Sequence, residues 1–295
     1  SPMINFRYHV VSIIGIFIAL AVGVVLGAGP LQRTINTGMN PSSSAASSDP
    51  ALSAQADAEA AGLKALASST LTGSLSGSKI ALVVLPGASE DDVSAIRSTL
   101  TDAGASVVGR VSLTDNWQST SMSQYRSTLS TSLSSHLSSS GAKGASADGV
   151  VGHAIIQVLT ETGPETDLLR QILTDKSTPL MMIDEDPAGG ATTIVAIGPR
   201  AQTTATASSA PASADAWTGL ALAVGTTFGV VVGDGSGRDT MIAQIRTSGT
   251  AVTTVDSVGT TLAAVDTALA LSHKATGARA YGVGTGAQSV IPTVK

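Results

Sequence analysis

The chain contains no cysteine, few aromatic residues and few charged ones. The absence of cysteine among its 295 residues excludes disulfide scaffolds, thiolate metal sites and cysteine nucleophiles. Aromatic residues make up only 3%, so stacking platforms for bases or sugars are not expected. Charged residues make up 13%, against a usual share of about 25%. The net charge of −5 argues against a basic surface for phosphates, so nucleic acid is not expected as a partner.

A long uncharged run lies near the amino terminus. Residues 10–31 carry no charge, and about 20 apolar residues suffice to cross a bilayer as a helix. A signal peptide is the alternative, but its apolar core usually spans only about 7–15 residues. We therefore predict that residues 1–31 form a cytoplasmic tip and a single transmembrane anchor. The flanking charges give only a slight bias for orientation, and we expect the large carboxyl-terminal domain to lie outside the cytoplasm.

Small residues recur every four positions along this predicted helix, at Gly15, Ala19, Gly23 and Gly27. This spacing lets two helix backbones approach closely in lipid, although small residues are common in membrane helices generally. We predict that the stripe is a packing face, directed at a second copy of the chain or at another membrane protein.

Residues 32–77 are predicted to form a Ser/Ala-rich linker with one short helix. Residues 40–50 are a low-complexity stretch that cannot bury a core. Residues 51–67 contain strong helix formers, preceded by Asp49 as a cap and Pro50 at the first helical position. With so few large apolar residues, a marginal helix and a short coiled coil fit this segment equally well.

Residues 78–295 are predicted to fold as an α/β extracytoplasmic domain with a parallel or mixed sheet. Short apolar runs that end in glycine or proline alternate with amphipathic segments, which is typical of layered α/β domains. The segment contains two βαβ-like units. Their similarity is explained equally well by a weak internal duplication and by chance recurrence of a common unit. The expected strands are 79–85, 106–111, 154–158, 180–183, 193–197, 228–232 and 251–255, and the expected helices are 90–103, 165–174, 239–247 and 260–272.

One turn has the composition of an anion or ligand site. It consists of Gly233, Asp234, Gly235, Ser236, Gly237 and Arg238, between a predicted strand and a predicted helix. Backbone amides at such a turn can bind an anion. However, the turn lacks the phosphate-loop lysine and the dinucleotide fingerprint. We therefore favour a tight structural turn and keep a ligand site as the alternative.

Metal and catalytic signals are weak. The acids 184–186 follow a predicted strand and could attract a hard cation, but a solvated acidic turn is the favoured interpretation. Met181 and Met182 are adjacent in a predicted strand, so they point to opposite faces and do not form the sulfur pair that copper(I) prefers. No nucleophile elbow follows a strand. We predict a protein that is not an enzyme and assign no cofactor, catalytic residue or metal ligand. The histidines, which lack metal-binding spacing, are His9, His136, His153 and His273.

The chain resembles the actinobacterial MctB family in residues 3–31 (MINFRYHVVSIIGIFIALAVGVVLGAGPL), 81–117 and 254–292. Members are described as copper transport proteins of the mycobacterial envelope, which implies a role in copper homeostasis or export. A related septal branch, SteB, partners the membrane protein SteA, which implies the alternative of a non-enzymatic scaffold in a septal or envelope complex. Members typically carry a longer, charged coiled coil where this chain has its short linker. The resemblance makes copper a possible ligand but supplies no ligand motif.

Overall fold

The computed structural model describes residues 49–202, 211–274 and 277–293. The predicted membrane anchor and its stripe of small residues lie outside these ranges. Within them, no helix combines the length and the apolar character that a membrane crossing requires. The chain divides into two compact units, residues 1–53 and 54–295, and the second unit contains the sheet described below.

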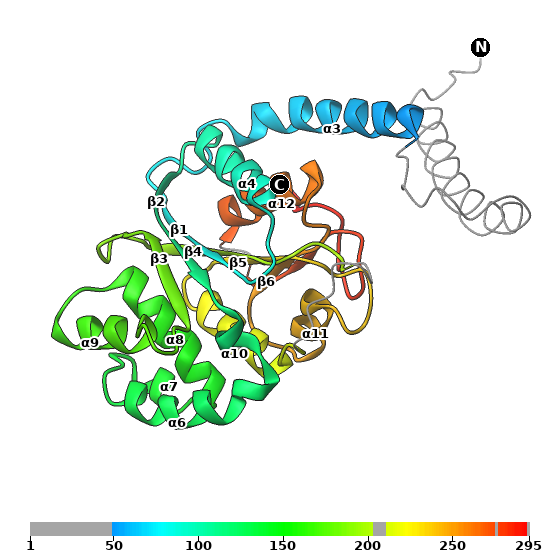
Figure 1. The fold of residues 1–295 in the computed structure, drawn as a ribbon. Coiled ribbons are helices and arrows are strands. Elements are labelled where there is room, and N and C mark those ends of the chain that lie inside the picture. Colours follow the sequence, from blue (N-terminus) through cyan, green and yellow to red (C-terminus); the bar gives the residue numbers. More distant parts are fainter. Residues whose placement is uncertain (1–48, 203–210, 275–276, 294–295) are drawn as a thin grey trace, which may run out of the picture. The chain divides into compact units, whose positions relative to one another are not determined.

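A seven-stranded sheet forms the centre of the second unit (Figure 1). Its spatial order is β3-β2-β1-β4-β5-β6-β7, and all neighbours are parallel except β3, which runs antiparallel to β2. The predicted α/β class with a mixed sheet is therefore confirmed. From the central pair β1 and β4, the strand order runs outward through β2 to β3 on one side and through β5 and β6 to β7 on the other, as in doubly wound folds. The strands are β1 (Lys79–Val84), β2 (Ser106–Leu113), β3 (Met181–Glu185), β4 (Thr193–Ile197), β5 (Val230–Val232), β6 (Thr253–Val255) and β7 (Ala280–Tyr281).

The central strands are continuous apolar runs because helices cover both faces of the sheet. In β1, Ala81 and Val83 belong to one hydrophobic core, whereas Ile80, Leu82 and Val84 belong to the other. Side chains that alternate between two cores leave no polar face, which explains why the sequence of this strand shows no alternation.

Two helices and the end of a third cover one face of the sheet. These are α4 (Glu90–Asp102), α12 (Thr261–Ser272) and the carboxyl-terminal end of α3 (Pro50–Leu71) (Figure 1). The Asp49 carboxylate accepts a hydrogen bond from the Ala51 amide at 3.0 Å, at the helix start that the sequence predicts. Leu71 and Leu75 are buried in this core, so part of the predicted linker packs with the globular domain.

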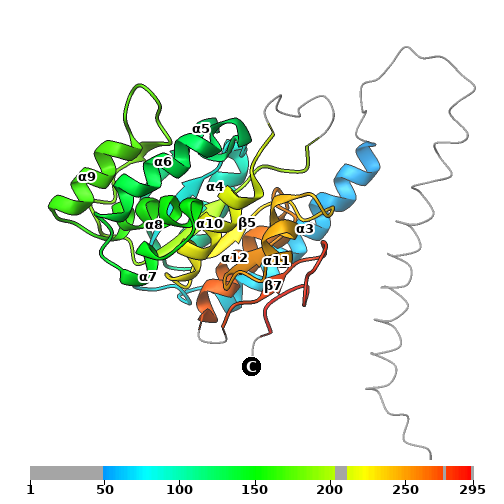
Figure 2. The same cartoon turned by 90° about the horizontal axis from the view of Figure 1, so that it is seen from below.

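The other face is covered by a longer series of helices. Figure 2 shows α6, α8, α9 and α10 lying together over it. The two βαβ-like units are β1–α4–β2 and β5–α11–β6, and their helices lie on opposite faces of the sheet. The helices on this face are α5 (Asp115–Gln118), α6 (Ser123–Ser134), α7 (Ser140–Lys143), α8 (Ala147–Thr160), α9 (Pro164–Leu173), α10 (Ala214–Gly225) and α11 (Met241–Thr247), with the 3-10 turn η2 (Thr120–Met122).

The strand predicted at residues 154–158 is wrong, because this run lies in α8. The helix is buried on nearly every side, between the sheet, α6 and α10, so its sequence lacks the polar face that identifies a surface helix. Helix α10 is not predicted either: half of its residues are buried, and apart from Asp215 and Thr218 its sequence is apolar or small, so it shows little of a polar face. The two helices cross at Gly152 and Gly219, where a Cβ on Gly152 would lie 2.5 Å from the Gly219 carbonyl oxygen.

Candidate functional site

A cleft lies beside the carboxyl ends of β5, β6 and β7, which is where open α/β sheets bind ligands. Its volume is about 430 Å³, within the range of roughly 300–1,000 Å³ that small-molecule sites occupy. Six of its ten lining residues carry a hydroxyl or a carboxylate group. They are Asp234, Ser236, Asp256, Ser257, Thr260 and Thr285.

Asp256 is the first residue after β6, and its carboxylate is 1% exposed. One oxygen accepts hydrogen bonds from the Ser257 hydroxyl at 2.7 Å and the Val283 amide at 2.9 Å. The other accepts from the Gly284 amide and from Arg246, each at 2.9 Å. Burial alone would raise the pKa of Asp256, but these four hydrogen bonds outweigh it and lower the pKa. The carboxylate is therefore ionised and saturated, which suits a structural anchor better than a general base.

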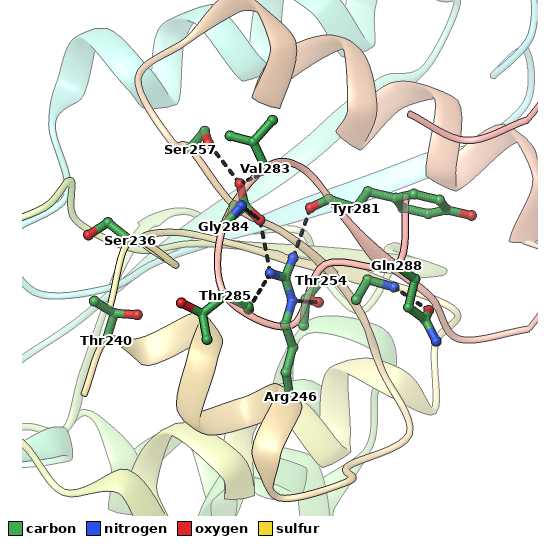
Figure 3. A network of polar contacts seen from close by, with 12 residues as sticks. Ser236, Thr240, Arg246, Thr254, Ser257, Tyr281, Val283, Gly284, Thr285 and Gln288 are labelled. Carbon is green, nitrogen blue, oxygen red and sulfur yellow. Dashed lines mark hydrogen bonds and ion pairs between the residues drawn. The ribbon is translucent and has the colours of Figure 1, made fainter. Parts of the chain in front are cut away.

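Arg246 of α11 connects three parts of the chain (Figure 3). Besides contacting Asp256, its guanidinium donates to the Thr254 hydroxyl of β6 at 2.9 Å. It also donates to the carbonyl oxygens of Tyr281 at 2.8 Å and Thr285 at 2.9 Å. Helix α11, strand β6 and the carboxyl-terminal loop are thus held together around one buried ion pair.

Glycines permit the close approach of backbone to Asp256. A Cβ on Gly282, whose φ is +126°, would lie 2.2 Å from the Asp256 carboxylate. A Cβ on Gly235 would lie 2.8 Å from the Asp256 Cβ, and one on Gly284 would lie 2.5 Å from the Gly235 carbonyl oxygen. No side chain fits at these three positions, which explains why glycine recurs in both loops around the cleft.

The glycine-rich turn at residues 233–238 lies partly in the cleft. Asp234 and Ser236 line it, and the Asp234 carboxylate accepts a hydrogen bond from the Ser236 amide at 2.9 Å. Arg238 is exposed and is not a lining residue. Across the described part of the chain, the lining has two carboxylates and neither lysine nor arginine. Because Asp256 is paired with Arg246, the charge of the lining that faces a ligand is that of Asp234, which favours a neutral or cationic ligand over an anion.

The boundary between β1 and β4, the usual ligand crevice of a doubly wound sheet, is occupied by the protein's own charges. Arg200, shortly after β4, donates to both carboxylate oxygens of Asp92 in the first turn of α4, at 2.8 and 2.6 Å. Glu90 and Asp91 lie in the same turn. These three acids interact favourably with the positive end of the α4 helix dipole, and their negative charges disfavour a phosphate there.

The acidic triplet at residues 184–186 forms surface ion pairs. Asp184 lies 3.3 Å from Arg110, Glu185 contacts Arg97, and Asp186 accepts two hydrogen bonds from Arg170. Side-chain hydrogen bonds from the arginines lower the pKa of both Glu185 and Asp186. Among the residues that the structure describes, no three or more histidine, cysteine or acidic side chains are grouped so that they could hold a metal ion.

The histidines lie apart from one another. His136 contacts Glu165 on α9, and His273 lies at the end of α12, where its Nδ1 is 2.7 Å from the Leu269 carbonyl oxygen. His153 lies in α8, where burial lowers its pKa. His9 falls outside the described residues. Of the described histidines, none lines the cleft, so the cleft has groups that bind a ligand but no histidine base to activate a nucleophile.

The sequence identified the glycine turn but missed Arg246 and Asp256, the pair that organises the site. Two signals could have found them. Asp256 directly follows a predicted strand, and residues 281–286 (YGVGTG) contain three glycines close to the carboxyl end of the chain. Because carboxyl ends of parallel strands meet at one edge of a sheet, these features could have been placed together.

The comparisons with known proteins agree on one family. A family model described as "Copper transport outer membrane protein, MctB" matches residues 3–292. Proteins named "Copper transporter MctB" from Mycobacterium bovis and from two strains of Mycobacterium tuberculosis are 30% identical to this chain over 140 residues. The aligned region covers 44% of this chain and 45% of each relative, so the chain spans about half the length of the curated relatives that it matches.

Proposed function

This chain belongs to the MctB family, as its sequence predicts, and we propose on that basis that it acts in copper homeostasis at the cell envelope. The match over residues 3–292 is the observation that carries the proposal. The names of the mycobacterial relatives support it, although the chain aligns with only about half of their length. The protein acts as a single-pass, non-enzymatic membrane protein with its α/β domain outside the cytoplasm.

The α/β domain contributes to this role by binding a ligand or a partner rather than by carrying copper in a preformed centre. Copper(I) prefers soft sulfur ligands. In the described residues, Met181 is fully buried and its neighbour Met182 is 56% exposed, so the two sulfur atoms do not converge. The same residues contain no metal-holding group of acids and histidines. Copper handling is thus expected to be indirect or to need a second component.

In this proposal, the second component binds to the membrane helix. The stripe Gly15, Ala19, Gly23 and Gly27 packs against a second copy or another membrane protein, because close backbone approach holds helices together in lipid. Gly23→Ile separates the helices, whereas Val22→Ile on a neighbouring face leaves the association intact. Cross-linking in membranes at matched expression measures the difference, and equal recovery of the complex from both variants contradicts the packing face. A septal scaffold with a SteA-like partner stays an alternative that no comparison supports.

Deletion of the gene in its own host tests the copper role. The deletion strain should accumulate more copper per cell than its parent when copper is supplied, and full-length chain in trans should restore the parental level. Unchanged copper content and unchanged growth under copper stress would contradict the proposal. Copper(I) titration of the purified full-length chain then separates direct from indirect handling, since tight stoichiometric binding would refute the indirect role.

A further inference from the structure

A groove lies between α3, α4 and α12, the helices that cover one face of the sheet (Figure 1). Its volume is about 270 Å³. An apolar cavity of about 150 Å³ is already large enough to bind benzene. Apart from Asp92, the buried part of the lining is apolar, with each side chain at most 7% exposed. These buried apolar residues, which we call the groove floor, are Leu71, Ile96, Ala263, Ala264 and Val265.

Several polar groups around the groove floor are bonded to the protein itself. The Thr99 hydroxyl donates a hydrogen bond to the Ala95 carbonyl oxygen at 2.9 Å, and the Thr72 hydroxyl donates to a carbonyl oxygen of α3 at 2.8 Å. The Asp92 carboxylate is paired with Arg200 at 2.6 and 2.8 Å. These groups need no partner from a ligand, so the groove suits a molecule that is mainly apolar.

Two charged side chains in the lining form no ion pair among the described residues. They are Lys64 on α3 and Asp102 on α4, and both are exposed. Along α3 the lining runs from Lys64 to Leu71, about 10 Å of helix length. A long apolar groove with a free cation at one end of its α3 wall fits an extended apolar chain that ends in an anionic group.

A lipid bilayer is the source of such chains that the domain can reach, and here the inference rests on the membrane anchor of the proposed function. The predicted anchor ends at Leu31, and residues 32–49 can span at most about 60 Å when fully extended. Helix α3, one wall of the groove, begins directly after them. The tether therefore lets the groove touch the bilayer surface, where an acyl chain can enter it without crossing bulk water.

We propose that this groove binds one acyl chain of a membrane phospholipid, with the lipid phosphate at Lys64. The chain exchanges the apolar interior of the bilayer for the groove floor, so little apolar surface is exposed to water in the transfer. Attraction between the phosphate and Lys64 favours the bound lipid. A lipid held in this way turns the face of the domain that carries α3, α4 and α12 toward the membrane.

Photo-crosslinking from the lipid tail tests the groove. The full-length chain is reconstituted into vesicles of phosphatidylcholine and phosphatidylglycerol, with a phosphatidylglycerol that carries a diazirine in its acyl chain. Mass spectrometry should then find adducts in residues 92–102 and 259–265, in addition to adducts in the anchor. Ala95→Phe, at an exposed lining position, fills the groove and should remove the groove adducts. Ser94→Phe, at the neighbouring exposed position outside the lining, is the matched control and should keep them.

A second pair of variants tests the contact with the phosphate. Lys64→Gln should lower the yield of groove adducts by up to about fivefold, the range expected for one exposed ion pair. Lys176→Gln removes an exposed lysine that does not line the groove and should leave the yield unchanged.

Four results would overturn the proposal. Adducts confined to residues 10–31 would support the anchor and refute the groove, whereas a chain that does not enter the vesicles would refute both. Equal groove adducts in Ala95→Phe and Ser94→Phe would mean that the lipid contacts the surface without entering the groove. A dimer that Ala95→Phe dissociates, with no lipid adduct in the groove, would assign the groove to a second copy of the chain. Groove adducts that Ala95→Phe removes and Ser94→Phe keeps support the proposal.

Discussion

Two regions of this domain pair acids with arginines, and they do so in opposite surroundings. At the β3 edge, the acids at residues 184–186 form partly exposed ion pairs with Arg97, Arg110 and Arg170. The Glu185 side chain, for example, is 46% exposed. At the end of β6, one acid, Asp256, meets Arg246 with both side chains almost fully buried. The first region is conspicuous in the sequence and the second is not. Burial, and not the number of acids, decides which region organises the structure.

The energetic difference follows from solvent. Exposed ion pairs typically contribute about 0–1 kcal/mol, because water screens the charges and long side chains lose freedom. Removal of one partner from a buried pair typically costs about 3–5 kcal/mol, because an uncompensated charge stays in the core. The two regions therefore allow a direct test of how far burial governs stability in this chain.

The largest expected effect comes from Asp256→Ala. It leaves the Arg246 guanidinium buried without its countercharge and frees the Val283 and Gly284 amides, so unfolding should become easier by about 3–5 kcal/mol. Urea unfolding of the full-length chain in detergent, followed by the fluorescence of the two tryptophans, measures this.

Asp256→Asn is the matched control for shape. Its amide group keeps one acceptor but turns a donor toward either Arg246 or the backbone amides, which are themselves donors. It should therefore remain clearly destabilised. Wild-type stability in Asp256→Asn would show that shape, and not charge, holds the site.

A smaller loss is expected from Gly235→Val in the turn beside the cleft. The new Cβ would lie 2.8 Å from the Asp256 Cβ, and overpacking of this kind typically costs about 1–3 kcal/mol. Arg238→Ala, three residues away and exposed, should change stability by less than about 0.5 kcal/mol. Thermal melting of both variants compares them. A large loss of stability in Arg238→Ala alone would mean that the charge of Arg238, and not the close packing at Gly235, stabilises this turn.

In contrast to the variants above, Asp266→Asn should raise the free energy of unfolding and thus stabilise the protein. The Asp266 side chain is completely buried in α12, neither of its carboxylate oxygens has a hydrogen-bond partner among the described residues, and burial raises the pKa at which its proton is lost to about 8. In the wild type the unfolded chain loses this proton near pH 4 and the folded chain near pH 8, so the contribution of Asp266 to stability is full below about pH 4 and falls up to about pH 8. At pH 7 the variant should gain roughly 1–2 kcal/mol after allowance for residual solvation, and near pH 4 it should match the wild type. Melting temperatures across this range test the sign, and a gain that persists at pH 4 would assign the effect to packing instead.

Most of the sheet was predictable because its central strands combine β-branched residues with terminal glycine or proline. Strand β4 was placed at residues 193–197 as observed, and the bounds of β1 differ from those predicted by one residue. The errors have more than one cause. The sequence of α8 is typical of a strand because the helix is covered on nearly all sides. Helix α10 is half buried, but it has few polar residues to mark its exposed side. Helix α6 is largely exposed, and its run of serine and threonine is not typical of a helix.

The candidate site was predictable only in part, for a different reason. Local composition reveals turns, so residues 233–237 stood out. The partners of this turn are Asp256 and Gly284, which are distant in sequence, and only the sheet brings them together. The unpaired state of Asp266 is equally invisible, since a single acid in a helix normally faces solvent.

The smallest expected effect lies at the β3 edge, where the exposed ion pairs should contribute less to stability than the buried pair. Arg97 donates two hydrogen bonds to Glu185, so the geometry is as good as that of the buried pair. If geometry governs stability, the pair should contribute as much as Arg246 and Asp256. If solvent governs it, a double-mutant cycle of Arg97→Ala and Glu185→Ala should give a coupling below about 1 kcal/mol. That coupling should shrink further in about 1 M salt, where the screening length is only about 3 Å. A coupling above about 2 kcal/mol that survives salt would mean that the exposed edge is held as firmly as the buried site.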